Sequence, residues 1–103
     1  MTDTVKNPPT LAMLREKRTQ ILTIASRHGA SNIRIVGSVA RGEATSESDV
    51  DLLLTTPPRQ NVFDLVALWI DIQEELGCDV SVISDSTTDE KFLQHILKDA
   101  IPL

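Results

Sequence analysis

The sequence is poor in aromatic side chains and contains a single cysteine. Only 3% of its 103 residues are aromatic, with two phenylalanines, one tryptophan and no tyrosine. The lone Cys78 excludes an internal disulfide and leaves no second cysteine for a metal site, so we interpret it as a small buried residue. Acidic residues outnumber basic ones by 15 to 10, which gives a formal net charge of −5. This balance argues against direct nucleic-acid binding, which needs lysine and arginine at the phosphates, but it does not exclude a nucleotide.

Long apolar runs are also absent. No stretch approaches the roughly 20 apolar residues that cross a bilayer, and the opening MTDTVKNPPT lacks the segments of a signal peptide. We therefore expect a cytoplasmic protein with no membrane partner. The length suits one domain, and a hydrophobic content of 41% is ordinary for a globular chain. We expect a flexible N-terminal arm over residues 1–9, which contains Pro8 and Pro9, and one domain over 10–103.

Apolar residues recur at helical spacing in three segments, 10–28, 61–76 and 87–100. In the first segment, the aliphatic stem of Arg18 is expected to fill a gap in the apolar stripe. In the second, Trp69 is expected to belong to the core. In the third, Thr88 is the candidate N-cap, because a hydroxyl can accept a hydrogen bond from the first turn.

Strand-like patterns fall between these helices, over 32–36, 49–56 and 78–84. The middle segment contains Leu52, Leu53 and Leu54 without interruption, which suggests burial on both faces and hence a central strand. The order helix, strand, strand, helix, strand, helix predicts a small α/β or α+β sandwich.

Two aspartates separated by one valine open the central strand. Because side chains alternate along a strand, Asp49 and Asp51 project from the same side, roughly 7 Å apart. Two like charges this close are costly to bury unless a cation or hydrogen-bond donors lie between them. Hard oxygen ligands suit Mg²⁺, so the pair is a candidate metal–nucleotide site. Taken alone, the pair fits equally well a solvated strand start in which Glu47 and Ser48 form a turn.

A Gly-Ser step ends the preceding strand. Gly37 and Ser38 would open a helical turn that offers backbone N–H groups and a hydroxyl to an anion such as triphosphate. Arg41 would lie on this turn or just after it, where its guanidinium could reach the same phosphates or hold an acidic neighbour. Considered singly, Ser38 fits an ordinary helix cap and Arg41 a surface charge. Their combination with Asp49 and Asp51 favours a nucleotide site.

The stretch GSVARGEATSESDVDLLL, residues 37–54, resembles the signature of the DNA polymerase β-type nucleotidyltransferase superfamily in its minimal-nucleotidyltransferase branch. That signature is Gly-Ser, ten residues, and Asp-x-Asp. The resemblance implies a mixed sheet with helices packed on one side, and two Mg²⁺ ions on Asp49 and Asp51. The family's third carboxylate lies on the strand after the second helix, where Asp79 stands, and would bind metal or act as general base. The nucleotide-binding residues that the resemblance implies are Gly37, Ser38, Arg41 and Ser48.

The resemblance also implies an activity, the transfer of AMP from ATP to a hydroxyl acceptor with release of pyrophosphate. Minimal members of the family are commonly paired with a HEPN-domain ribonuclease toxin, and our leading hypothesis is an antitoxin that adds AMP to a toxin tyrosine. The alternatives are a small-molecule nucleotidyltransferase, such as one that modifies aminoglycosides, and a non-catalytic antitoxin that acts by binding. His28 and His95 lie on helical patterns away from this site, and we interpret both as structural or surface residues.

Overall fold

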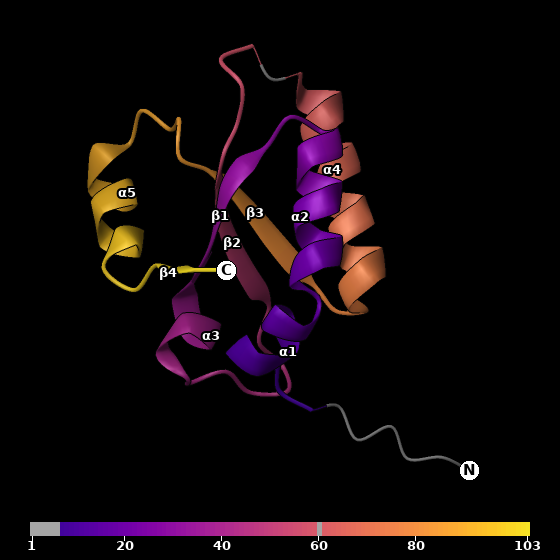
Figure 1. Cartoon of the computed structure of the whole chain (residues 1–103). Helices are drawn as coiled ribbons and strands as arrows, with labels where there is room; N and C mark the ends of the chain where they lie inside the picture. Colours follow the sequence, from indigo (N-terminus) through magenta and orange to yellow (C-terminus); the bar gives the residue numbers. More distant parts are fainter. Residues whose placement is uncertain (1–6, 60) are drawn as a thin grey trace.

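The computed structural model describes residues 7–59 and 61–103 and contains a mixed four-stranded sheet with helices around it (Figure 1). Residues 1–6, most of the expected N-terminal arm, lie outside the described residues. The helices are α1 (Leu11–Glu16), α2 (Arg18–Arg27), α3 (Gly37–Arg41), α4 (Val62–Leu76) and α5 (Glu90–Leu97). The strands are β1 (Ser31–Val36), β2 (Val50–Thr55), β3 (Val80–Ser84) and β4 (Ile101–Pro102).

The strand order is β3-β2-β1-β4. Strand β2 runs parallel to β3, because α4 carries the chain back between them, and β1 is antiparallel to both of its neighbours. The expected central strand is therefore confirmed as β2, and Leu52, Leu53 and Leu54 are all fully buried. Strand β4 is not among the expected strands, because its two residues are too few to display an alternating pattern.

Helices α2 and α4 cover one face of the sheet, and α5 lies on the other side of the sheet from them in Figure 1. The core forms between the covered face and these two helices. Helices α2 and α4 therefore pack on one side of the sheet, as the resemblance implies. Its fully or almost fully buried side chains include Ile21, Ile24, Ile33, Ile35, Leu52, Leu54, Leu68 and Ile72. No helix in the described part of the chain combines the length and apolar character of a membrane span.

The single helix expected over 10–28 is wrong, because the chain forms two helices that break at Lys17. The Lys17 ammonium donates a hydrogen bond to the Glu75 carbonyl oxygen at 2.8 Å and forms an ion pair with the Glu75 carboxylate at 3.2 Å. This contact with the C-terminal turn of α4, where carbonyls lack partners, accompanies the break. The expected role of Arg18 is also wrong, since its side chain is exposed. Leu14 and Ile21 are fully buried without it.

The placement of Trp69 in the core is wrong as well, because its side chain remains 39% exposed. The indole N–H donates a hydrogen bond to the Val80 carbonyl oxygen at the edge of β3. Helix α4 instead buries Leu68 and Ile72, because its apolar arc is wider than the sheet can cover. Cys78 is only partly buried, packed against the margin of the core, which corrects the expectation of full burial.

Helix α5 is capped by Asp89 and not by Thr88. The Asp89 carboxylate accepts a hydrogen bond from the Phe92 N–H at 3.0 Å, and a carboxylate also suits the positive end of the helix dipole. The interpretation of the histidines is confirmed. His28 lies 3.0 Å from Asp71 and joins α2 to α4, and His95 is exposed on α5.

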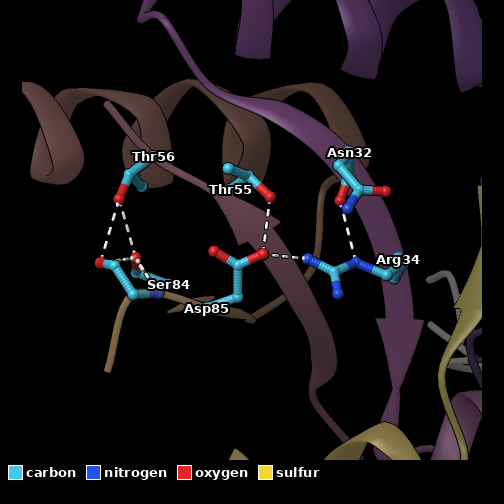
Figure 2. A network of polar contacts seen from close by, with 7 residues as sticks. Asn32, Arg34, Thr55, Thr56, Ser84 and Asp85 are labelled. Carbon is cyan, nitrogen blue, oxygen red and sulfur yellow. Dashed lines mark hydrogen bonds and ion pairs between the residues drawn. The ribbon is translucent and has the colours of Figure 1, made fainter. Parts of the chain in front are cut away.

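A polar network ties β1, β2 and the end of β3 together (Figure 2). The Asp85 carboxylate accepts hydrogen bonds from Arg34 at 2.7 Å and from the Thr55 hydroxyl at 2.6 Å. Burial alone would raise the pKa of Asp85, but these two hydrogen bonds and the charge of Arg34 outweigh it and lower that pKa. The network fixes the sheet at the end of β2 remote from Asp49 and Asp51.

Candidate active site

Asp51 lies on the face of the sheet that α2 and α4 leave uncovered. Its neighbours Val50 and Leu52 point into the core, so the alternation along β2 directs the carboxylate the other way. In the sheet register Asp51 pairs with Val36 of β1 and with Ser81 of β3. Asp49 precedes the strand by one residue and is exposed on the same side. The structure thus confirms that the two aspartates share a face.

Gly37 touches Asp51 directly. It follows β1 without a linker and begins α3, with φ of +73°, a conformation that favours glycine. A Cβ atom at this position would overlap the Asp51 carboxylate oxygen Oδ2 inside van der Waals contact. The glycine is therefore required by two independent constraints, the backbone conformation and the space that the Asp51 carboxylate occupies.

The electrostatics of Asp51 favour a bound cation. Burial and the negative charge of Asp49 raise the pKa of Asp51, and a hydrogen bond from the Ser81 side chain and the charge of Arg41 oppose them only in part. Among the described residues, the Asp49 carboxylate has no hydrogen-bond or ion-pair partner. Two adjacent carboxylates with incomplete charge compensation are a donor set that fits a hard divalent ion such as Mg²⁺.

Asp79 immediately precedes β3, and its carbonyl oxygen accepts a hydrogen bond from the Val50 N–H at 3.0 Å. Since Val80 points into the core, alternation places Asp79 on the same face as Ser81 and Asp51. Its exposed carboxylate has no partner among the described residues. Over residues 7–59 and 61–103, however, no three acidic, histidine or cysteine side chains converge where a metal ion could bind. The structure brings Asp49 and Asp51 together and leaves Asp79 beside them.

Ser38 and Arg41 lie on α3 as expected, but only Arg41 already has hydrogen-bond partners within the described residues. The Ser38 hydroxyl has no partner within the described part of the chain. The Arg41 guanidinium is held by Asp99 at 3.2 Å and by Glu43 at 3.0 Å, and these hydrogen bonds raise its pKa. Arg41 thus holds acidic neighbours, which is one of the two roles that the sequence suggested for it.

Ser48 has a local partner. Its hydroxyl accepts a hydrogen bond from the Thr45 N–H at 2.8 Å and closes the turn before β2. Ser48 and Asp79 also border one cavity of about 260 Å³, which lies between the segment ending at Pro9, the turn at 46–48 and the end of α4. In this arrangement Ser48 shapes the loop that leads into Asp49.

Comparison with known proteins agrees with this geometry. Residues 18–101 match the model of the nucleotidyltransferase domain family, so the chain belongs to that family and is a nucleotidyltransferase. A "putative protein adenylyltransferase" of Methanocaldococcus jannaschii is 31% identical over 88 residues, which cover 85% of this chain and 95% of that protein.

Two solved structures share the fold. A "putative minimal nucleotidyltransferase" superposes with a TM-score of 0.81 at 36% identity and covers 92% of this chain and 97% of its own. A toxin–antitoxin structure with AMP-PNP superposes with a TM-score of 0.71 at 15% identity, over 82% of this chain and 69% of its own, and supports the fold alone. The expected minimal-nucleotidyltransferase fold is confirmed.

Ser81 is the site residue that sequence reasoning missed. The alternating pattern already placed Ser81 on the same face as Asp79. Only the parallel register of β2 and β3 shows that Ser81 lies opposite Asp51. A serine in a strand has no signal that distinguishes it from an ordinary surface residue.

We expect Ser81→Ala to raise the pKa of Asp51 further, because the mutation removes a hydrogen bond that stabilises the ionised carboxylate. Carbon-detected NMR titration of the metal-free protein measures this shift directly. Ser81→Thr, which keeps the hydroxyl, should titrate like the wild type. An unchanged Asp51 midpoint in Ser81→Ala would show that the hydroxyl does not act on this carboxylate.

Proposed function

We propose that this nucleotidyltransferase transfers AMP from ATP to a hydroxyl group of a partner protein, a HEPN-domain toxin, in a Mg²⁺-dependent reaction in the cytoplasm. The observation that carries the proposal is the pair Asp49 and Asp51 on the open face of the sheet, with Gly37 against Asp51. Two comparisons support it: the relative from M. jannaschii is named as a protein adenylyltransferase, and a similar fold occurs in a toxin–antitoxin structure with AMP-PNP.

In this proposal Asp49 and Asp51 hold Mg²⁺, and Asp79, which does not converge with them on one metal position within the described residues, serves as the general base. Bound there, the metal would neutralise charge on the α-phosphate and on the departing pyrophosphate. Ser38 has a free hydroxyl at the start of α3 and would donate it to the triphosphate. Arg41 is already occupied by Asp99 and Glu43, so contact with phosphate would require it to leave these partners.

The reaction is an in-line displacement at the α-phosphorus. The acceptor oxygen forms a new bond to phosphorus while the bond to the bridging oxygen of the β-phosphate breaks, and pyrophosphate leaves with that electron pair. The acceptor proton passes to Asp79, whose carboxylate is exposed and unpaired within the described residues.

The cavity beside Asp79 supports an aromatic hydroxyl as acceptor. Its volume is about 260 Å³, and its lining combines the apolar Pro9, Met13 and Leu76 with polar side chains that include Ser46, Glu47 and Ser48. Cavities of about 150 Å³ already hold a benzene ring. A tyrosine side chain could therefore enter this space with its hydroxyl near the Asp79 carboxylate at the rim.

We expect Asp79→Ala to keep binding to the toxin but to lose transfer, because an exposed carboxylate contributes little to folding. When the variant is co-expressed with the toxin, the two should co-purify, the toxin should lack added AMP by intact mass, and growth should not be rescued. Asp64→Ala, which removes an exposed aspartate from α4, is the matched control and should transfer normally.

Circular dichroism of both variants checks that they are folded. If Asp79→Ala rescued growth without a mass increase on the toxin, the toxin would be neutralised by binding and not by AMP transfer. Transfer to an aminoglycoside while the toxin stays unmodified would favour the small-molecule enzyme.

A further inference from the structure

Helix α4 carries a line of large apolar side chains that nothing in the described structure covers. We call this line the α4 stripe, and it consists of Val62, Phe63, Val66, Trp69 and Ile70. Phe63 is 82% exposed and Val62 71% exposed, and the other three are about 40% exposed. Their spacing of three and four residues places them along one side of the helix. The stripe continues into a groove of about 320 Å³ between α4 and the edge strand β3, lined by Leu65, Val80 and Val82 among others.

The stripe contains no charged residue, although the helix has four acidic ones. Asp71 faces α2, where it contacts His28, and Glu75 reaches Lys17. Asp64 shares the side of Asp71, since the two are seven residues apart. The fourth, Glu74, is exposed and follows Ile70 by four residues, so it lies at the C-terminal margin of the stripe. Interface cores are depleted of charge in the same way, and exposed apolar patches of this kind mark protein contacts.

We propose that the α4 stripe packs against the α4 stripe of a second copy of this chain, across a two-fold axis. Copies of a chain with net charge −5 repel one another, so a self-contact is least opposed where the facing surfaces carry no charge. The area is also sufficient. The two aromatic side chains and three aliphatic ones expose on the order of 500 Å² per copy, and two copies reach the roughly 1,000 Å² that a specific interface needs.

The contact uses the helix and not strand addition at β3. The Val80 N–H donates to the Gln73 side chain at 3.1 Å, and the Val80 carbonyl oxygen accepts from the Trp69 indole. Both outward backbone groups of Val80 are therefore already paired, which protects this part of the edge from another strand.

The stripe is symmetric about Val66, with Val62 and Phe63 before it and Trp69 and Ile70 after it. When two such helices cross antiparallel on a two-fold axis, Val66 meets its own copy near the axis, and Phe63 meets the region of Trp69 and Ile70. This symmetry provides a charge test that only a self-contact passes.

Sedimentation velocity of the metal-free protein, from about 1 to 500 µM because small interfaces are weak, measures the association. We expect a dimer at the upper concentrations. Phe63→Glu should remain monomeric over the whole range, and Phe92→Glu, a matched change at the 43% exposed phenylalanine of α5, should dimerise like the wild type.

Val66→Glu and Val66→Lys supply the second test. Each variant alone should be monomeric, because like charges meet at the axis, and an equimolar mixture should recover a dimer. Circular dichroism melts confirm that each variant is folded. A wild type that is monomeric throughout, a dimer that Phe92→Glu but not Phe63→Glu abolishes, or a mixture that stays monomeric would each overturn the proposal. So would a monomer whose stripe is covered by a different protein.

Discussion

Asp51→Asn is expected to reduce nucleotidyl transfer by about a thousand-fold or more. The amide is neutral and a poorer ligand for Mg²⁺, and the loss of several kcal/mol of charge stabilisation in the transition state corresponds to a rate effect of this size. Steady-state assays with ATP, Mg²⁺ and the protein acceptor measure it. Transfer at the wild-type rate would show that Asp51 is not a metal ligand.

The same variant should be more stable than the wild type when metal is absent. Burial and the charge of Asp49 raise the pKa of Asp51 in the folded protein above its unfolded value. Such a group favours the folded state at low pH, and this contribution is lost as the pH rises through the folded-state pKa, so ionised Asp51 destabilises the fold at neutral pH. Thermal melts at pH 7 without metal should therefore give a higher Tm for Asp51→Asn. An inactive variant with a lower Tm would point to misfolding.

Gly37→Ala should abolish transfer nearly as completely as Asp51→Asn. The new Cβ would overlap Oδ2 of Asp51, so the carboxylate must move away from its place beside Asp49. The left-handed backbone at residue 37 adds a stability cost of about 1–2 kcal/mol. Activity assays and denaturant unfolding measure the two effects separately.

Gly42→Ala is the matched control for this variant. Gly42 has the same φ of +73°, but a Cβ atom there meets nothing within 4 Å. Gly42→Ala should therefore lose a similar amount of stability but keep its transfer activity. If both variants lost activity equally, backbone strain and not displacement of Asp51 would be the cause.

The sequence predicted most of the fold because its strongest patterns are local. Leu52, Leu53 and Leu54 predicted a strand buried on both faces, and β2 lies inside the sheet as expected. The errors occur where a distant contact decides the structure. Lys17 contacts Glu75, 58 residues away, at the point where the first helix breaks, and Trp69 bonds to the edge of β3.

Local patterns also predicted part of the candidate site. Alternation along one strand was enough to place Asp49 and Asp51 on a shared face. The contact between Gly37 and Asp51 depends on how β1 and β2 pair, and the position of Ser81 depends on the register of β2 and β3. Pairing between strands leaves no trace in a single sequence, so these features could be found only in the structure.

Labelled phosphates of ATP show directly whether the protein transfers AMP. The protein is incubated with Mg²⁺, a HEPN-domain toxin as the acceptor, and ATP labelled at either the α- or the γ-phosphate. We predict that the acceptor gains label only from α-labelled ATP, that γ label appears in pyrophosphate, and that Asp51→Asn does neither. Label from γ-labelled ATP on the acceptor, or undiminished α labelling by Asp51→Asn, would contradict the account.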